Sequence, residues 1–409
     1  MSSQRINIQR ISLAAGAISL FIVYMILWGR MITSPTDRTG TDFIAFYAAG
    51  RVAEEYGSSH AYDIALQQKV QEKEVGFQLS SGQALLYNHM PYLIPVLQIL
   101  VNQNYMASFA RWTILLLAVY AAGFWGLVHW FPADWDTAQR RRFFVGAISF
   151  FPCFASLLLG QDTAFLFLGV ALLGWGISDN RDWLAGVGLA LVTVRPHISI
   201  LLALPFLFSR RGILWWFLGI AGSLAVTSIA ILGIEGTKDF IDVLFISAAG
   251  EWYGMKEIAM YNLIGLLARS LPLVGAESIR LVGWTVYLAA IPALCCWAAC
   301  ARKMDIHSLS VIILVSLLVV PHLHFHDLAL FLFPLLTASL RIETGTIYRG
   351  IQSALQPMII SLLLLFSSFH TTILHIWPYL IMLALFILVF RRHLIYRGSR
   401  EKEHLMGSS

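Results

Sequence analysis

The stretch "LAGVGLALVTVRPHISILLALPFLF", residues 184–208, is apolar except at its middle, where Arg195-Pro196-His197 interrupts it. Each half has only about 11 to 13 residues, too few to cross roughly 30 Å of hydrocarbon as a helix. Backbone without helical hydrogen bonds is tolerated at membrane depth where it lines a cavity. The stretch therefore predicts two short helices that meet at a polar turn. Residues Ser308–Leu340 are interrupted in the same way by "PHLHFHD", Pro321 to Asp327.

The composition places both stretches in a membrane protein. Of 409 residues, 58% are hydrophobic and only 12% are charged, whereas soluble domains carry about 25% charged residues. We expect an all-α polytopic membrane protein whose first apolar run is a retained signal anchor. The net charge of +5 reflects basic residues in short loops and tails, so no nucleic-acid partner is expected.

Counting the spans gives the expected topology. Each interrupted stretch counts as two half-length crossings, and eight uninterrupted runs bring the total to about twelve transmembrane helices. The eight runs are Ile11–Trp28, Trp112–Val128, Phe143–Leu159, Thr163–Ser178, Ile213–Ile234, Leu281–Ala301, Ile351–Phe369 and Thr371–Phe390.

The basic residues orient this topology. With twelve crossings, six basic clusters fall on one side, which the positive-inside rule assigns to the cytoplasm together with both termini. This count requires Tyr92–Val101 to lie at the interface without crossing. The clusters are Arg5 and Arg10, Arg140 to Arg142, Arg210 and Arg211, Arg302 and Lys303, Arg341 and Arg349, and Arg391 and Arg392.

We expect one integral membrane domain, residues 1–409, in an inner membrane, with its active site on the periplasmic or external face. Its parts are an N-terminal module 1–234 with a first external loop 29–111, a second external loop 235–280, C-terminal helices 281–392 and a cytoplasmic tail 393–409.

The first external loop predicts short amphipathic helices lying along the membrane. Thr41 is the expected N-cap of the first, which ends near Gly57, and Asp63 caps a second, which ends near Gly76.

The first of these helices starts with a lone acid, in "GTDFIAFYAAG", Gly40 to Gly50. Phe43, Phe46 and Tyr47 follow at the spacing of one apolar stripe, which we interpret as an anchor at the lipid surface. Asp42 fits a helix-start acid stabilised by the macrodipole, or a general base that takes a proton from an acceptor hydroxyl.

Arg195 and His197 lie between two half-spans. The guanidinium fits a side chain that snorkels to the headgroups, or a clamp on a donor phosphate with His197 as a second donor.

The remaining polar candidates share the external face. His322, His324, His326 and Asp327 fit a structural turn, a substrate contact or a metal site, although histidines at i, i+2 and i+4 do not share one helical face. Gln161, in the Gly160–Asp162 turn, fits a hairpin turn or a substrate contact. Further candidates for substrate contacts are Tyr47, Tyr62, Asn88, His89 and Asn262.

The order of these motifs over residues 40–335 resembles glycosyltransferase family 87 of the GT-C superfamily, which includes mycobacterial phosphatidylinositol mannoside mannosyltransferases. The motifs are Asp42-Phe43 with Tyr47, Tyr62-Asp63, "YNHMPY", "GQD", "RPH", "MYN" and "PHLHFHDL".

The resemblance implies a GT-C fold, a lipid or glycan acceptor and inverting transfer of a sugar, mannose in known relatives, from a polyprenyl phosphate carrier without a metal or other cofactor. It also implies that Asp42 is the base, that Arg195 stands where relatives more often have lysine, and that His326 and Asp327 line the site. The single proline of "YNHMPY", Pro91, departs from the consecutive prolines of relatives and bears on the acceptor groove.

The chemistry of the residues agrees with this resemblance. An acceptor hydroxyl must lose its proton as it attacks, whereas a lipid phosphate leaves without a general acid, so one carboxylate suffices. The alternative is a transporter or flippase of lipid-linked sugars, which also needs broken helices and charges at the midplane. We expect a monomer. The sequence contains no nucleotide-binding or zinc-protease motif.

Overall fold

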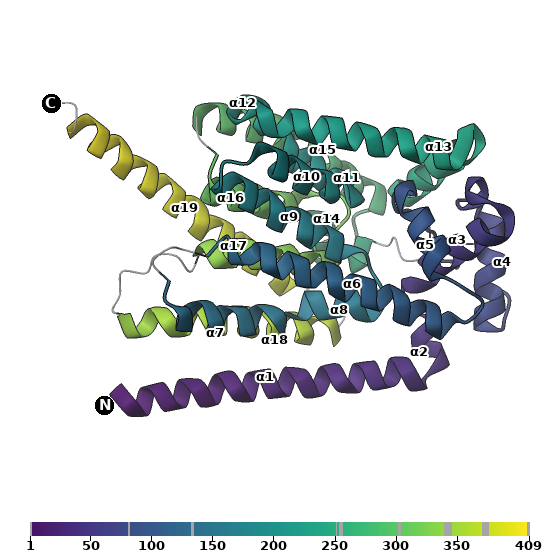
Figure 1. Ribbon diagram of the computed structural model, residues 1–409, viewed down its shortest axis with the longest axis horizontal. Helices are drawn as coiled ribbons and strands as arrows, with labels where there is room; N and C mark the ends of the chain where they lie inside the picture. Colours follow the sequence, from purple (N-terminus) through teal and green to yellow (C-terminus); the bar gives the residue numbers. More distant parts are fainter. Residues whose placement is uncertain are drawn as a thin grey trace.

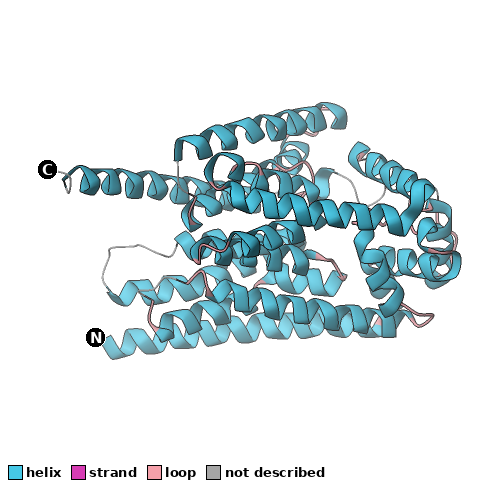
Figure 2. Ribbon diagram, turned by 45° about the horizontal axis from the view of Figure 1, so that its top comes forward, coloured by secondary structure: helices cyan, strands magenta, loops and turns pink. Residues whose placement is uncertain are grey.

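The computed structural model describes residues 2–80, 82–131, 135–250, 252, 257–301, 304–338, 346–369 and 376–406. Every regular element in these ranges is a helix, as Figure 2 shows, so the predicted all-α fold is confirmed. Helices α1, α6 and α13 run along the long axis of the molecule (Figure 1). Helix α1 begins and α19 ends at one end, and α2 to α5 lie at the other.

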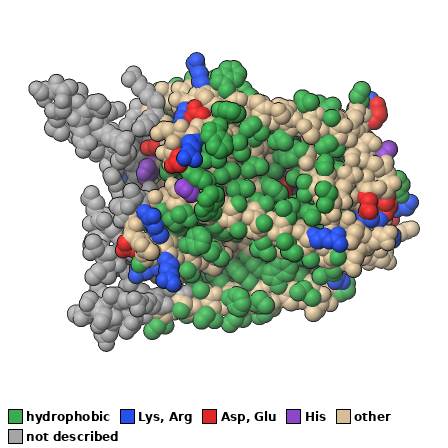
Figure 3. Space-filling model, viewed as in Figure 1, with side chains coloured by type: hydrophobic (Ala, Val, Ile, Leu, Met, Phe, Trp, Pro, Cys, Tyr) green, Lys and Arg blue, Asp and Glu red, His purple; other side chains and the backbone are tan. Residues whose placement is uncertain are grey.

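Five helical segments of the described chain are long and apolar enough to cross a membrane. On the face seen in Figure 3, hydrophobic side chains cover the middle and charged ones gather toward the two ends, as expected for a membrane protein. The other expected spans are shorter apolar helices, so the count of twelve crossings stays a prediction. The five segments belong to α1 (Ser2–Thr33), α6 (Tyr105–Val128), α7 with α8 (Thr137–Ile148 and Phe151–Leu159), α13 (Arg211–Ala249) and α15 (Ala276–Ala301).

Two of these segments differ from their predicted bounds. The run Phe143–Leu159 is divided between α7 and α8, because Phe150 is extended and Pro152 lies in the first turn of α8. Helix α13 continues beyond Ile234 to Ala249, so the expected loop 235–280 begins as helix. The backbone bends at Gly233 (φ 66°, ψ −172°). The helix then continues through the charged residues that follow.

Both interrupted stretches break where the sequence predicted. Pro196 starts α11, a position where the absence of an N–H costs no helical hydrogen bond, and Arg195 lies in the break. In the second stretch, residues 320–324 form no helix between α16 and the short helix η5. The helices of the two stretches are α10 (Asp182–Leu191), η3 (Val192–Val194), α11 (Pro196–Ala203), α12 (Phe206–Ser209), α16 (Ile306–Val319), η5 (Phe325–Phe331) and α17 (Leu332–Ala338).

The first external loop folds into the predicted short helices, with one cap reassigned. The Asp63 carboxylate accepts the backbone N–H of Leu66 at 3.0 Å, as expected of an N-cap. The N-cap of α3 is Asp42 and not Thr41, whose hydroxyl instead donates to the carbonyl of Arg38 at 3.0 Å. The loop helices are α2 (Pro35–Thr39), α3 (Phe43–Tyr56), η1 (Ser58–His60), α4 (Ile64–Val75), η2 (Pro91–Leu93) and α5 (Ile94–Leu100).

Helix α3 is buried in protein and does not lie at the lipid surface. Every residue from Phe43 to Ala53 is buried, because α4 and α5 cover one side of the helix and α6 another. The ring of Phe46 packs against Tyr87 and Trp112, with centroids 5.4 and 5.3 Å away. The expected membrane anchor of Phe43, Phe46 and Tyr47 is therefore wrong, and these rings belong to the core.

The remaining helices complete the bundle. Helix α9 packs between α6 and α10, and α16 packs against α19. The start of the expected span Thr371–Phe390 lies outside the described residues, and the expected tail 393–409 is helical as far as Met406. These helices are α9 (Thr163–Ser178), η4 (Glu257–Ala259), α14 (Leu263–Ser270), α18 (Thr346–Phe369) and α19 (Trp377–Met406).

Candidate active site

A cavity of about 580 Å³ lies where the loop helices meet the two helix breaks. Its size is typical of small-ligand sites, which range over about 300–1,000 Å³. Its walls come from the start of α3, the segment before η2, the α8–α9 turn, the break before α11, the end of α13, the start of α15 and residues 321–327. Most of the expected site residues line it: Asp42, Asn88, His89, Gln161, Arg195, His197, His322, His324, His326 and Asp327.

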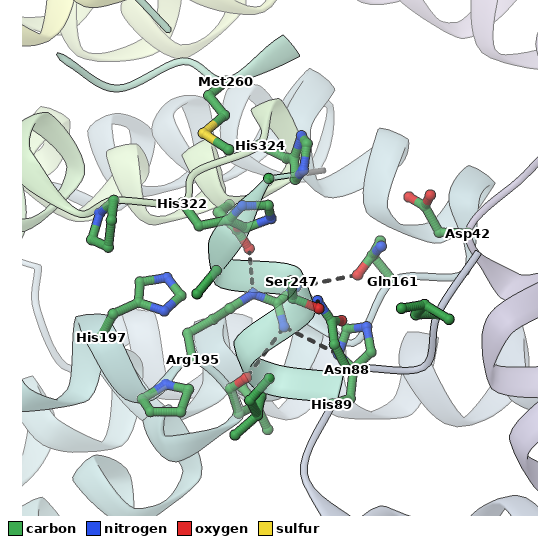
Figure 4. A pocket seen from close by; sticks show the side chains of 18 of the residues that line it. Asp42, Asn88, His89, Gln161, Arg195, His197, Ser247, Met260, His322 and His324 are labelled. Carbon is green, nitrogen blue, oxygen red and sulfur yellow. Dashed lines mark hydrogen bonds and ion pairs between the residues drawn. The ribbon is translucent and has the colours of Figure 1, made fainter. Parts of the chain in front are cut away.

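Asp42 lies at one side of this cavity, next to Gln161 and across from His324 (Figure 4). Its side chain is partly exposed, and it makes no cap hydrogen bond to α3. Within the described part of the chain, no hydrogen bond or ion pair engages its carboxylate. A carboxylate in this state has its lone pairs available to a ligand in the cavity.

Gly160 explains why Gln161 lies beside Asp42. Its backbone is left-handed, with φ at 72°, and a Cβ built on it would lie 2.6 Å from the Cβ of Phe43. Only glycine allows the α8–α9 turn to pack this closely against the first residue of α3. Trp112 holds the turn by donating its indole N–H to the Gly160 carbonyl at 2.8 Å.

A buried ionic network surrounds Arg195. Its Nη1 lies 2.9 Å from Oδ1 of Asp162, and its Nε lies 3.3 Å from Oδ1 of Asp327. Its Nη2 donates to Oε1 of Gln161 at 3.2 Å. The side chains of Arg195, Asp162 and Asp327 are 9%, 0% and 1% exposed. The guanidinium therefore joins three segments that are far apart in the sequence, and most of its donors are engaged within the protein.

His89 extends the network to the first external loop. Its Nδ1 lies 2.9 Å from Oδ2 of Asp162 and 3.3 Å from Nη1 of Arg195. A neutral ring nitrogen either donates or accepts, and the shorter contact with a carboxylate favours donation to Asp162. The Tyr62 hydroxyl donates to the His89 carbonyl at 2.5 Å, which fixes the backbone of this histidine.

Three of the expected site residues do not line the cavity. Tyr62 lies outside the cavity lining and donates its hydroxyl to the His89 carbonyl. Tyr47 donates its hydroxyl to Glu74 at 3.1 Å and is buried between loop helices. Asn262 caps α14 by accepting the N–H of Gly265 and donates to the Val320 carbonyl at 2.5 Å. Each has a structural partner, which their order in the sequence does not reveal.

Residues 321–327, which contain three histidines, form one wall of the cavity (Figure 4). The rings of His322 and His324 have centroids 4.6 Å apart, and Nε2 of His326 lies 3.7 Å from Oδ2 of Asp327. Among the residues that the structure describes, no three histidine, cysteine or acidic side chains are arranged to hold a metal ion. The imidazoles instead offer N–H donors and acceptors to a ligand.

Tyr92 joins the first external loop to the broken helix. Its hydroxyl shares a hydrogen bond of 3.1 Å with Oγ1 of Thr193, two residues before Arg195. Burial raises the pKa of Tyr92 to about 12, so its hydroxyl stays protonated at physiological pH. The contact positions the wall of the cavity and supplies no acid or base.

Sequence reasoning missed a second arginine in the cavity. Arg280, at the start of α15, donates from Nη1 to Oε1 of Glu257 at 2.5 Å, and both residues line the cavity. A signal was present, since the positive-inside rule disfavours a basic residue at the end of a span that is expected to be external, opposite Arg302 and Lys303.

Comparison with known proteins agrees with this fold. The family model of glycosyltransferase family 87 matches residues 91–321, more than half of the chain. The match covers η2, the α8–α9 turn, the break at Arg195 and the start of α15; it begins after Asp42 and ends before His322. No curated protein matches the chain. The chain is an all-α membrane protein that belongs to glycosyltransferase family 87.

Proposed function

We propose that this glycosyltransferase moves a sugar, mannose by the resemblance to its relatives, from a polyprenyl phosphate carrier to a hydroxyl of a lipid or glycan acceptor. The reaction inverts the anomeric carbon and takes place on the external face of the inner membrane, with Asp42 as general base. The observation that carries the proposal is the state of the Asp42 carboxylate, which faces the cavity and makes no hydrogen bond or ion pair with the described residues.

The other carboxylates near the cavity are engaged. Asp162 and Asp327 are paired with Arg195, and Glu257 is paired with Arg280. A carboxylate that is already bonded to a guanidinium is a weaker proton acceptor, because the cation stabilises its charge. Asp42 is therefore the best candidate for base among the described residues of the cavity.

The reaction needs one such group. The acceptor oxygen forms a bond to the anomeric carbon and transfers its proton to Asp42. The bond from that carbon to the phosphate oxygen breaks, and its electron pair leaves with the lipid phosphate. Glycosidases need a second carboxyl group to protonate a poor leaving group, whereas a phosphate leaves as an anion.

The phosphate needs donors as its charge grows. The guanidinium of Arg195 is largely engaged by Asp162, Asp327 and Gln161, so we expect it to hold the cavity walls in place. We expect the ring of His197 to face the donor phosphate. The ring nitrogen Nε2 of His197 is buried without a hydrogen-bond partner among the described residues. We expect Gln161, Asn88, His322 and His324 to contact the sugar or the acceptor.

The test is Asp42→Asn in purified protein supplied with polyprenyl-phospho-sugars and a native lipid extract. We expect transfer to fall by about 10²–10⁴-fold while donor binding is retained, because asparagine keeps the shape of the site but cannot take the proton. The matched control is Asp37→Asn, since Asp37 is a paired acid in α2 outside the cavity.

Transfer by Asp42→Asn at nearly the wild-type rate would disprove the base assignment. Movement of a lipid-linked sugar between leaflets, with no transfer to any acceptor, would instead favour the transporter.

A further inference from the structure

Arg280 and Glu257 form an ion pair at the edge of the cavity, apart from the network around Arg195. Nη1 of Arg280 lies 2.5 Å from Oε1 of Glu257, and the two side chains are 21% and 13% exposed. The pair connects the start of α15 with the short helix η4. The reaction described above uses neither residue.

The two arginines of the cavity differ in the donors that they have left. Arg195 contacts two carboxylates, the Gln161 side chain and the Val194 carbonyl. Few of its N–H groups are therefore available to a ligand. Among the described residues, Arg280 has one hydrogen-bond partner, on Nη1, and none of them engages Nε or Nη2. A guanidinium binds phosphate best through two parallel N–H bonds, which these two nitrogens can provide.

The net charge around each arginine also favours Arg280 as the phosphate site. Arg195 with Asp162 and Asp327 carries a formal charge of about −1, since one cation faces two anions. Arg280 with Glu257 is neutral overall. A lipid phosphate is therefore repelled less at Arg280 than at Arg195.

The end of α13 is shaped to fit this pair. Gly250 has a left-handed backbone (φ 69°), and a Cβ built there would lie 2.9 Å from Nη1 of Arg280 and 3.0 Å from Oε1 of Glu257. A larger residue would push the guanidinium away from the position that it occupies.

The wall near the pair is apolar and suits a hydrocarbon chain. Leu244, Ile264 and Trp284 line the cavity together with Met260, which Figure 4 shows on the side away from His89. Ile200 of α11 also lines the cavity. These apolar side chains suit contact with the isoprenoid chain of a lipid carrier.

We propose that Arg280 binds the phosphate of the lipid carrier through Nε and Nη2, while Glu257 keeps its contact with Nη1 and holds the guanidinium in place. This inference rests on the proposed function, because it places the donor phosphate of that reaction. It assigns Arg280 as a binding residue and Glu257 as its positioning partner.

The first experiment measures binding of farnesyl phosphate, a short polyprenyl monophosphate without sugar, to the full chain in nanodiscs. We expect Arg280→Ala to raise Kd by about 10- to 100-fold, the range of a lost hydrogen bond to a charged group. Arg280→Lys keeps the charge but loses the fork, so we expect a smaller rise. The control is Arg30→Ala, which removes an ion-paired arginine outside the cavity.

The second variant, Glu257→Gln, separates the binding role from a structural one. It removes the negative charge beside the phosphate site and keeps a side-chain oxygen for Nη1, so we expect Kd for farnesyl phosphate to fall, whereas a purely structural ion pair predicts weaker binding for both variants. Wild-type affinity in Arg280→Ala, with thermal unfolding also unchanged, overturns the phosphate site. A rise in Kd for Glu257→Gln overturns the positioning role given to Glu257.

The two proposals fail in different ways. If sugar transfer depends on Asp42 but not on Arg280, only the phosphate assignment is wrong. If no polyprenyl-phospho-sugar is turned over and farnesyl phosphate still binds in an Arg280-dependent way, the proposed reaction is wrong and the lipid phosphate site stands.

Discussion

Replacing Arg195 by methionine tests whether the buried network holds the site together. Arg195 is 9% exposed and separates two carboxylates, Asp162 and Asp327, that are 0% and 1% exposed. Without the guanidinium, these two anions face each other in a medium of low polarity. Breaking a buried ion pair by removing one partner costs about 3–5 kcal/mol, a large part of the roughly 5–15 kcal/mol that stabilises a typical protein.

The measurement is the free energy of unfolding from a denaturant titration of the detergent-solubilised protein. The control is Arg30→Met, where the arginine is 66% exposed and its pair with Asp37 contributes less than about 1 kcal/mol. We expect the triple variant Arg195→Met, Asp162→Asn, Asp327→Asn to recover most of the loss, because it removes the unpaired charges. Equal unfolding of Arg195→Met and the control, or a triple variant less stable than the single one, would refute this reasoning.

Two further predictions concern the turn beside the base and the need for a metal. Gly160→Ala forces a non-glycine residue to φ 72° and a Cβ against Phe43, so we expect a loss of about 1–3 kcal/mol of unfolding free energy and slower transfer. The control is Gly222→Ala in α13, where a Cβ would have nothing within 4 Å. We expect this control to gain up to about 1 kcal/mol of unfolding free energy. Equal effects of the two substitutions would contradict the role of the turn. We expect sugar transfer to survive EDTA, since arginine and histidine donors can stabilise the leaving phosphate. Loss of activity that a divalent cation restores would instead show that the reaction needs a metal.

Local signals in the sequence were reliable for the short elements. Asp63 and Gly76 marked the ends of α4, because an N-cap carboxylate and a left-handed glycine satisfy backbone groups within a few residues. Arg195-Pro196-His197 marked the break before α11, because proline removes a helical hydrogen bond. The bounds that were missed belong to α7 and α8, which divide one expected span at Phe150, and to α13 and α19, which continue as helix beyond their apolar runs.

The surroundings of α3 could not be predicted in the same way. Its apolar stripe of Phe43, Phe46 and Tyr47 suits a membrane surface and a protein interior equally, because lipid tails and core side chains are both apolar. Packing against α4, α5 and α6 decided between them.

The sequence by itself determined the class of the molecule, its broken helices, its family and a set of polar segments that meet at one cavity. The tertiary structure alone decided which side chains of these segments form ion pairs and hydrogen bonds within the protein. Arg195 is separated from Asp162, His89 and Asp327 by 33, 106 and 132 residues, so their contacts leave no local pattern. The same long-range packing engages those acids, leaves Asp42 without a partner among the described residues, and brings Arg280 into the cavity. Whether a carboxylate is a base or one half of an ion pair depends on neighbours that only the fold brings within reach.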